Sequence, residues 1–111
     1  MTTVAVTVTF PGPRPSQAHT VSAIVEDVSL ADGLAAPVAE QRLAQVPLGD
    51  LLTLEVSVPD PDERTSYAVR VHVDITGDGS VSAGDFVSTQ SHPVLTQGHG
   101  TQVTVPVRRV G

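Results

Sequence analysis

The sequence predicts an all-β protein, a single antiparallel β-sandwich of about seven to eight short strands. Twenty of the 111 residues are valine, and apolar residues recur at every second position in several stretches. This alternation is the pattern of half-buried strands. Turns rich in proline, glycine and aspartate separate the stretches at nearly regular spacing, as in sandwich folds. The length fits one domain covering residues 1–111, large enough to bury a core without disulfides.

The expected strands follow this alternation. The clearest example is "SYAVRVHVD", in which Tyr67, Val69, Val71 and Val73 share one face. Pro106 removes an N–H from the last strand, so one side of that strand should be a sheet edge or face solvent. The segment 30–37 reads as a loop with room for one helical turn. Strands are expected over residues 2–10, 19–29, 38–45, 51–58, 66–74, 85–89 and 101–109, with 92–100 forming a kinked edge and turn.

Composition excludes several classes of function. The net charge is −6, all six basic residues are arginine, and aromatic residues make up 3%. A chain with neither a basic stripe nor a stacking platform is not expected to bind nucleic acid. Cysteine is absent, which removes disulfides, thiolate ligands and a lipobox cysteine. With no membrane span or signal peptide in the sequence as it stands, we expect a cytoplasmic protein, or a periplasmic or extracellular one if a leader is removed.

The stretch "DITGDGSVSAGD", residues 74–85, departs from the strand pattern. Its spacing resembles the calcium loop of EF-hands and, more closely, that of dockerins, in which aspartate can close position 12. Calcium takes six to eight oxygen ligands, and alternate residues of a tight loop can point inward to supply them. The predicted metal ligands are Asp74, Thr76, Asp78, Ser80 (through its carbonyl), Ser82 and Asp85, at positions 1, 3, 5, 7, 9 and 12.

Other residues of this loop have expected roles. Gly79, at position 6, allows the sharp turn, and Val81, at position 8, is expected to anchor the loop to the core. Thr76 is uncharged where aspartate or asparagine is usual, so we expect a weak, structural Ca²⁺ site. The preceding residues read as strand and not helix, so the loop would lie within a β-hairpin. The alternative is an ordinary turn, because "DG" is common in hairpins.

The sequence gives little support for catalysis. The four histidines His19, His72, His92 and His99 form no H-x-H or H-x-x-x-H pair, so a zinc site would need long-range convergence. No G-x-S-x-G nucleophile motif and no phosphate-binding glycine loop is present. We therefore expect no enzyme. The alternative is an enzyme with a histidine-lined pocket, which a structure would favour if two or more of these histidines lay together with a carboxylate.

Three segments resemble a known family. "VEDVSLADGLAAPVAEQ" (25–41), "YAVRVHVD" (67–74) and "PVLTQG" (93–98) are similar, in the same order and at similar spacing, to small bacterial lipoproteins of the YbaY/YscW type. That family includes the pilotins, or lipoprotein chaperones, of type III secretion. The resemblance implies a β-sandwich and a non-enzymatic role in binding a protein partner.

Together these features predict a calcium-binding β-sandwich module with a chaperone-like or protein-interaction role. The edge of the strand that contains Pro106 is the expected partner surface, by strand addition. The alternative is a metal-free structural or assembly subunit that acts by self-association, so a homo-oligomer is possible. An unchanged melting curve with calcium, together with a concentration-dependent oligomer, would favour that alternative.

Overall fold

A computed structural model describes residues 1–29, 35–49 and 51–111, and all regular elements within these ranges are strands. The loop expected over residues 30–37 falls partly on residues 30–34, which lie outside the described residues. None of the described residues forms a helix long and apolar enough to span a membrane. The strands are β1 (Thr2–Thr9), β2 (Gln17–Asp27), β3 (Ala36–Pro47), β4 (Leu51–Val58), β5 (Tyr67–Asp74), β6 (Phe86–Ser88), β7 (His92–Val94) and β8 (Gln102–Arg109).

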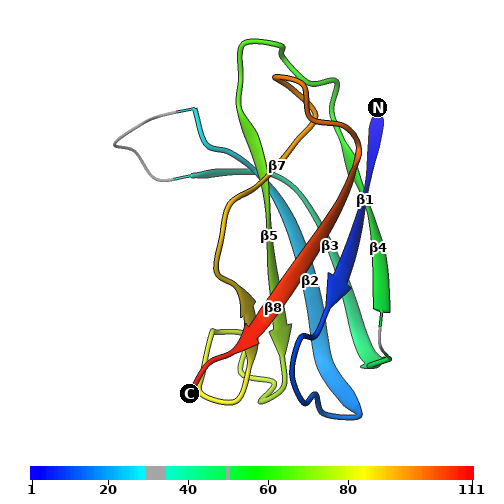
Figure 1. The fold of residues 1–111 in the computed structure, drawn as a ribbon, viewed down its shortest axis with the longest axis vertical. Helices are drawn as coiled ribbons and strands as arrows, with labels where there is room; N and C mark the ends of the chain where they lie inside the picture. Colours follow the sequence, from blue (N-terminus) through cyan, green and yellow to red (C-terminus); the bar gives the residue numbers. More distant parts are fainter. Residues whose placement is uncertain (30–34, 50) are drawn as a thin grey trace.

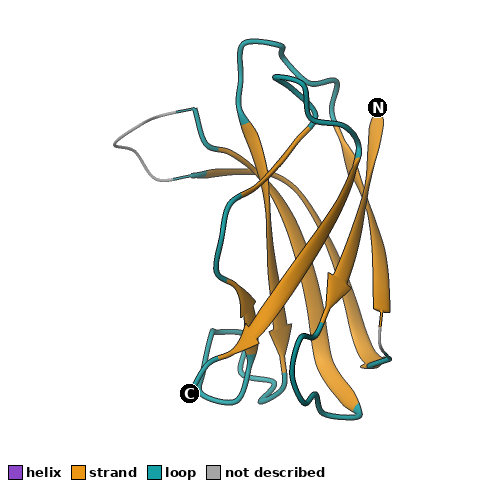
Figure 2. Ribbon diagram, viewed as in Figure 1, coloured by secondary structure: helices purple, strands orange, loops and turns teal. Residues whose placement is uncertain are grey.

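The strands form one strongly curved sheet in the order β3-β2-β5-β6-β8-β1-β4, with β7 paired to β5 (Figures 1 and 2). The end strands β3 and β4 follow each other in the chain and lie side by side. The sheet therefore curls into a nearly closed, barrel-like shape. A bulge between Val25 and Glu26, where β2 pairs with β3, adds to the local twist.

The all-β class is confirmed, but the antiparallel sandwich is wrong. β1 pairs with β8 in parallel, with Ala5 opposite Gln102 and Thr9 opposite Pro106, whereas the other ladders are antiparallel. The alternation of apolar and polar residues indicates that one face of each strand is buried. It does not say whether that face meets a second sheet or the far wall of the same curled sheet, nor in which direction the neighbouring strand runs.

The core consists of the inward-facing residues of the alternating stretches. β1 shows the pattern clearly, because Val4, Val6 and Val8 are fully buried while Ala5 and Thr7 are partly exposed. β-branched valine suits such a pleated, half-buried surface. The largest fully buried side chains are Leu54, Val4, Val6, Val8, Val21, Val25, Val56, Val58, Val71, Val73, Val94 and Val105.

Candidate functional site

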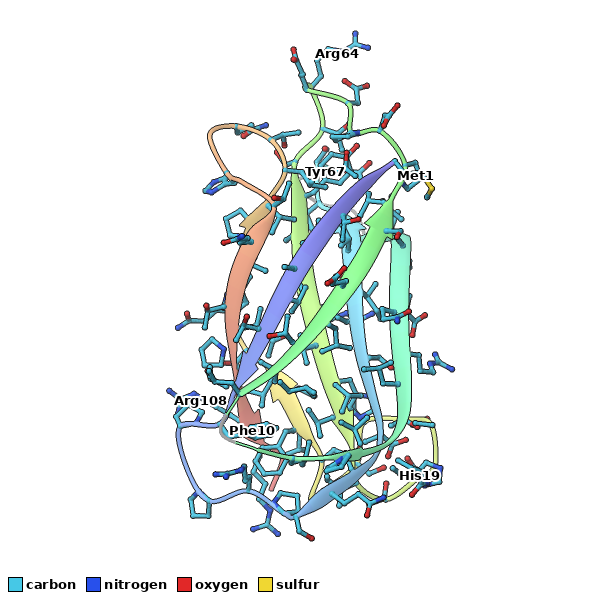
Figure 3. All side chains as sticks on the ribbon, turned by 90° about the vertical axis from the view of Figure 1, so that its right-hand side faces the viewer. Met1, Phe10, His19, Arg64, Tyr67 and Arg108 are labelled. Carbon is cyan, nitrogen blue, oxygen red and sulfur yellow. The ribbon has the colours of Figure 1, made fainter. Side chains whose placement is uncertain are left out.

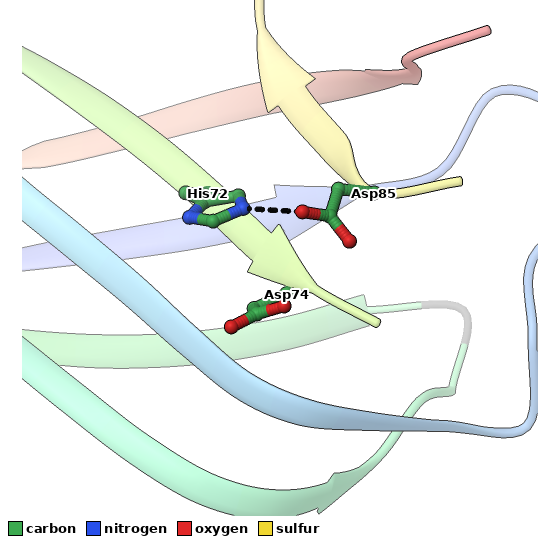
Figure 4. Close-up of side chains that lie close together, drawn as sticks. All are labelled: His72, Asp74 and Asp85. Atoms are coloured by element: carbon green, nitrogen blue, oxygen red, sulfur yellow. Dashed lines mark hydrogen bonds and ion pairs between the residues drawn. The ribbon is translucent and has the colours of Figure 1, made fainter. Parts of the chain in front are cut away.

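The Asp/Gly loop connects β5 to β6, as expected for an insertion in a hairpin. Asp74 is the last residue of β5, and Asp85 directly precedes β6. The two strands pair antiparallel, with Val73 opposite Phe86, so both aspartates lie at the base of the loop. Both are buried, and Figure 4 shows them beside His72 of β5.

Asp85 is the most enclosed polar residue of the site, with no exposed surface. Its Oδ1 accepts hydrogen bonds from the amides of Ile75 (2.9 Å) and Thr76 (3.2 Å). Its Oδ2 accepts from the amide of Ser82 (3.0 Å) and from His72 Nε2 (3.0 Å). Burial alone would raise the pKa of this carboxyl, but the hydrogen bonds from His72 and the three amides outweigh it and hold the pKa below 3.8. Asp85 is therefore a stably ionised group inside the fold.

Asp74 organises the first half of the loop. Its Oδ1 accepts the amide of Gly77 at 2.8 Å, and its Oδ2 accepts the amide of Gly79 at 3.1 Å. Both glycines have positive φ, +80° and +78°, which a side chain would oppose. The expected turn at Gly79 is confirmed. At Gly77 a Cβ would also lie 3.1 Å from His19 Nδ1, so two independent constraints favour glycine there.

The remaining predicted ligands form a second, exposed cluster toward the tip. Asp78 accepts the amide of Ser80 at 3.1 Å and the hydroxyl of Ser82. These hydrogen bonds, led by that from Ser82, lower the pKa of Asp78 below 3.8. Ser82 Oγ also lies 3.4 Å from the carbonyl of Ser80. The expected anchoring by Val81 is wrong, because this side chain is 53% exposed. The amides bonded to Asp74 and Asp85 hold the loop in its place.

The structure thus divides the six predicted ligands into two groups. Thr76 Oγ1 lies 3.4 Å from Asp74 Oδ1 and 3.5 Å from Asp85 Oδ1, so these three residues meet at the base. Ligand atoms of His72, Asp74 and Asp85 all lie within 4.8 Å of one another. Backbone amides already donate hydrogen bonds to both carboxylates, so a cation at the base would share these oxygens with the amides. Calcium binding stays a prediction of the spacing.

The histidines are dispersed. His72 meets Asp74 and Asp85, and in the described part of the chain this is the one cluster of three or more potential metal ligands. His19 contacts Gln45 at 3.4 Å. His92 is partly buried, and its Nε2 has no hydrogen-bond partner among the described residues. Burial lowers its pKa below 6.5. The convergence that would favour an enzyme is therefore not found within these ranges.

A groove of about 700 Å³ lies at the same end of the barrel as the Asp/Gly loop. One wall is the proline-rich segment Pro11–Pro15 between β1 and β2, and the other is the end of β8. Ile75, Gly84, Phe86 and Val107 also line it. Phe86 is supported from the side by Phe10, in an edge-to-face contact with ring centroids 5.4 Å apart. This end is the lower one in Figure 3, where Phe10 and Arg108 are labelled.

Three arginines line the groove: Arg14, Arg108 and Arg109. Arg14 Nε donates to the carbonyl of Leu48 at 3.4 Å, which ties the proline-rich segment to the end of β3. Arg108 and Arg109 are exposed, and no carboxylate among the described residues pairs with them. The groove therefore combines an apolar floor with two exposed arginines, Arg108 and Arg109, that have no carboxylate partner among the described residues.

The edge of β8 was expected to be open beside Pro106. The amide of Ala5 donates to the carbonyl of Thr101, so the even-numbered backbone groups of β8 point away from β1. On the side of β8 that faces away from β1, β6 pairs only with residues 107–109. No described strand pairs with that side of residues 102–106, whose other side pairs with β1. The prediction is confirmed. The open edge is short, and Pro106 interrupts its row of donors.

Sequence reasoning missed the groove. Its lining comes from three segments that are far apart in the chain, and the parallel pairing of β1 with β8 together with the pairing of β6 with β8 brings them together. A usable signal was the adjacent pair Arg108–Arg109, the one place where two of the six arginines are neighbours. The bond between His72 and Asp85 was also missed, because the hairpin register sets it.

One comparison with known proteins shows a family, and another shows the fold. Residues 1–107 match the family described as "Type III secretion system lipoprotein chaperone (YscW)". A solved structure, an alternative pilotin from the type II secretion system of Vibrio cholerae, superposes with a TM-score of 0.70 at 20% sequence identity, covering 98% of each chain. At this identity the likeness shows the fold alone. No curated protein matches the chain.

Proposed function

Because the chain belongs to the YscW family of lipoprotein chaperones, we propose that it is a chaperone-like module that holds a segment of a partner protein in the groove between residues 11–15 and the end of β8. The observation that carries the proposal is the groove itself. Its floor is formed by Phe86 and Val107, which are almost fully buried beneath it, and the groove opens to solvent at one end of the barrel. Sites of this kind favour binding of an apolar side chain with polar contacts at the rim.

The walls of the groove are pre-organised, which favours affinity because little freedom is lost on binding. Three prolines restrict the segment 11–15. The amide of Leu48 donates to the carbonyl of Ser16 at 3.0 Å, just beyond this segment. On the opposite wall, Val110 exchanges two backbone hydrogen bonds of 2.7 Å with Gly84 and Asp85. The Asp/Gly loop thus has a structural role as the support of one wall.

The groove is a better partner surface than the edge of β8. Strand addition needs a continuous row of backbone donors and acceptors, and Pro106 breaks that row. We propose that the partner is a subunit of a secretion or envelope assembly, as the family description suggests. That description as lipoprotein chaperones also favours action outside the cytoplasm.

Site-specific cross-linking tests this function. A photo-reactive residue in place of Pro13 lies in the groove wall, and one in place of Arg64 lies at the opposite end of the barrel (Figure 3). In cells that naturally express the protein, we expect a discrete adduct from the Pro13 position that the Arg64 position does not give. Identical adducts from both positions, or none from Pro13, would contradict the proposal.

We propose calcium binding by residues 74–85 as a second, weaker property. The support is the spacing of the acidic residues and the contact of Thr76 with both Asp74 and Asp85. A cation has to share these carboxylates with amide donors, and Thr76 adds no charge. A weak site follows, with a structural and not a regulatory role. Self-association without metal is the alternative, and light scattering over a range of concentrations distinguishes it.

A further inference from the structure

We propose that the groove selects an acidic segment, in which a glutamate or aspartate side chain binds Arg109 while a neighbouring apolar side chain rests on Phe86 and Val107. This inference rests on the proposed function and adds the chemistry of the partner. Arginine matches a carboxylate with two parallel hydrogen bonds, so it can give both orientation and affinity.

The distribution of charge singles out this groove. The chain carries a net charge of −6, yet Arg108 and Arg109 line the groove, and none of the described residues that line it is acidic. Elsewhere arginines have carboxylate neighbours: Arg42 with Glu40 at 2.9 Å, Arg64 with Asp62 at 3.4 Å and Arg70 with Glu26 at 3.4 Å. Arg108 and Arg109 are thus an exposed pair of cations that the described residues leave available for an external anion.

The register of β8 assigns different roles to the two arginines. Arg109 has the same parity as Val105 and Val107, which are buried, and it lies opposite Phe86 in the ladder with β6. Opposed residues of an antiparallel pair share a face, so Arg109 extends from the apolar floor. Arg108 lies on the other face, opposite Val87. Arg109 is therefore the expected direct contact, and Arg108 raises the positive potential at the rim.

The nearby aspartates do not cancel this potential. Asp85 directs its carboxylate into the fold, toward His72 and the amides of Ile75, Thr76 and Ser82. Asp74 is likewise buried and bonded to the amides of Gly77 and Gly79. Both carboxylates are turned onto internal donors and away from the groove, and the charged side chains among its described lining residues are arginines.

The test uses three capped peptides that differ only in charge: leucine-containing segments flanked by glutamate, by glutamine or by lysine. Capping removes the terminal carboxylate, so only side chains can supply the anion. Titration of the full chain by fluorescence polarisation should give at least about tenfold tighter binding of the glutamate peptide than of the glutamine peptide, and weaker binding at high salt.

Variants locate the contact. Arg109→Glu should reduce affinity for the glutamate peptide about tenfold or more, whereas Arg64→Glu, the same change at the opposite end, should leave it unchanged. The double variant Arg108→Glu with Arg109→Glu should prefer the lysine peptide. All three arginines are exposed, so the variants are expected to fold normally, and melting curves check this.

Several results would overturn the inference. Equal binding of the glutamate and glutamine peptides would remove the selection for acidic segments while leaving the groove function standing. The absence of binding by the glutamate peptide would refute acidic selection, and a groove adduct in the cross-linking experiment would still support the broader function. Binding to anionic lipid vesicles but not to the glutamate peptide would assign the arginines to a membrane surface instead.

Discussion

Replacing Asp85 by asparagine tests whether hydrogen bonds to a buried carboxylate hold the end of the barrel together. Asp85 presents two oxygens: Oδ1 accepts from the amides of Ile75 and Thr76, with the Thr76 hydroxyl 3.5 Å away, and Oδ2 accepts from the Ser82 amide and His72. An asparagine amide has only one oxygen. If its NH₂ group faces Ile75 and Thr76, two amides lose their acceptor. If it faces the other way, the amide of Ser82 and His72 lose theirs. Neither orientation satisfies the site.

The expected loss follows from these contacts. Hydrogen bonds to a charged group contribute about 1.5–3 kcal/mol each, and an unsatisfied buried donor costs about 1–3 kcal/mol. Two such losses, partly relieved by relaxation, give about 3–5 kcal/mol for Asp85→Asn. For a domain of this size, a loss of that order lowers the Tm by at least about 10 °C. Asp78→Asn is the matched control, because Asp78 is exposed at the tip and its replacement should change stability much less than Asp85→Asn does.

Chemical denaturation and melting curves measure this loss, and pH provides a second readout. The pKa of Asp85 in the folded state lies below 3.8, so the unfolded chain takes up the proton first as pH falls. The stabilisation is complete above about pH 4 and is lost as pH decreases through the folded-state pKa. Asp85→Asn should reduce this acid sensitivity. A loss of stability for Asp85→Asn no larger than that for Asp78→Asn would refute the role assigned to Asp85.

Three further changes have defined outcomes. Gly77→Ala should destabilise by about 1–2 kcal/mol and more than Gly79→Ala, since both have positive φ but only Gly77 faces His19; equal losses in urea unfolding would contradict this. Because burial lowers the pKa of His92, the free energy of unfolding should decrease as pH falls below about 6.5. His92→Leu should flatten this pH dependence. An unchanged slope in the variant would mean that another group causes the dependence. Millimolar calcium should raise the Tm over EDTA by no more than about 3 °C, with magnesium as control, whereas a rise of about 10 °C would indicate a tight site.

Local patterns in the sequence were sufficient for most of the strands. The alternation in 67–74 placed β5 correctly, and the missing N–H of Pro106 correctly indicated an open edge. Both are properties of neighbouring residues. The parallel pairing of β1 with β8 joins the two ends of the chain, and no local pattern carries information about it. The sandwich prediction failed for this reason.

The same limit applies to the candidate site. The spacing of residues 74–85 identified a loop with special carboxylates, and the structure shows that Asp74 and Asp85 are indeed buried and bonded. The spacing could not reveal that backbone amides and His72 supply their partners, because those contacts depend on how the loop folds back on the hairpin. Exposed Val81 marks the difference from a metal loop anchored in a core.

Chemical-shift mapping tests the central claim, that a partner segment binds in the groove at the end of the barrel. In a titration of ¹⁵N-labelled protein with the glutamate peptide, we expect the largest amide shifts in residues 11–16 (apart from the prolines, which have no amide), 75, 84–86 and 107–109. The edge Gln102–Thr104 and the opposite end around Arg64 should remain unchanged. Shifts concentrated along Gln102–Thr104 would indicate strand addition to β8, and shifts around Arg64 would place the partner at the wrong end of the molecule; either result would contradict the claim.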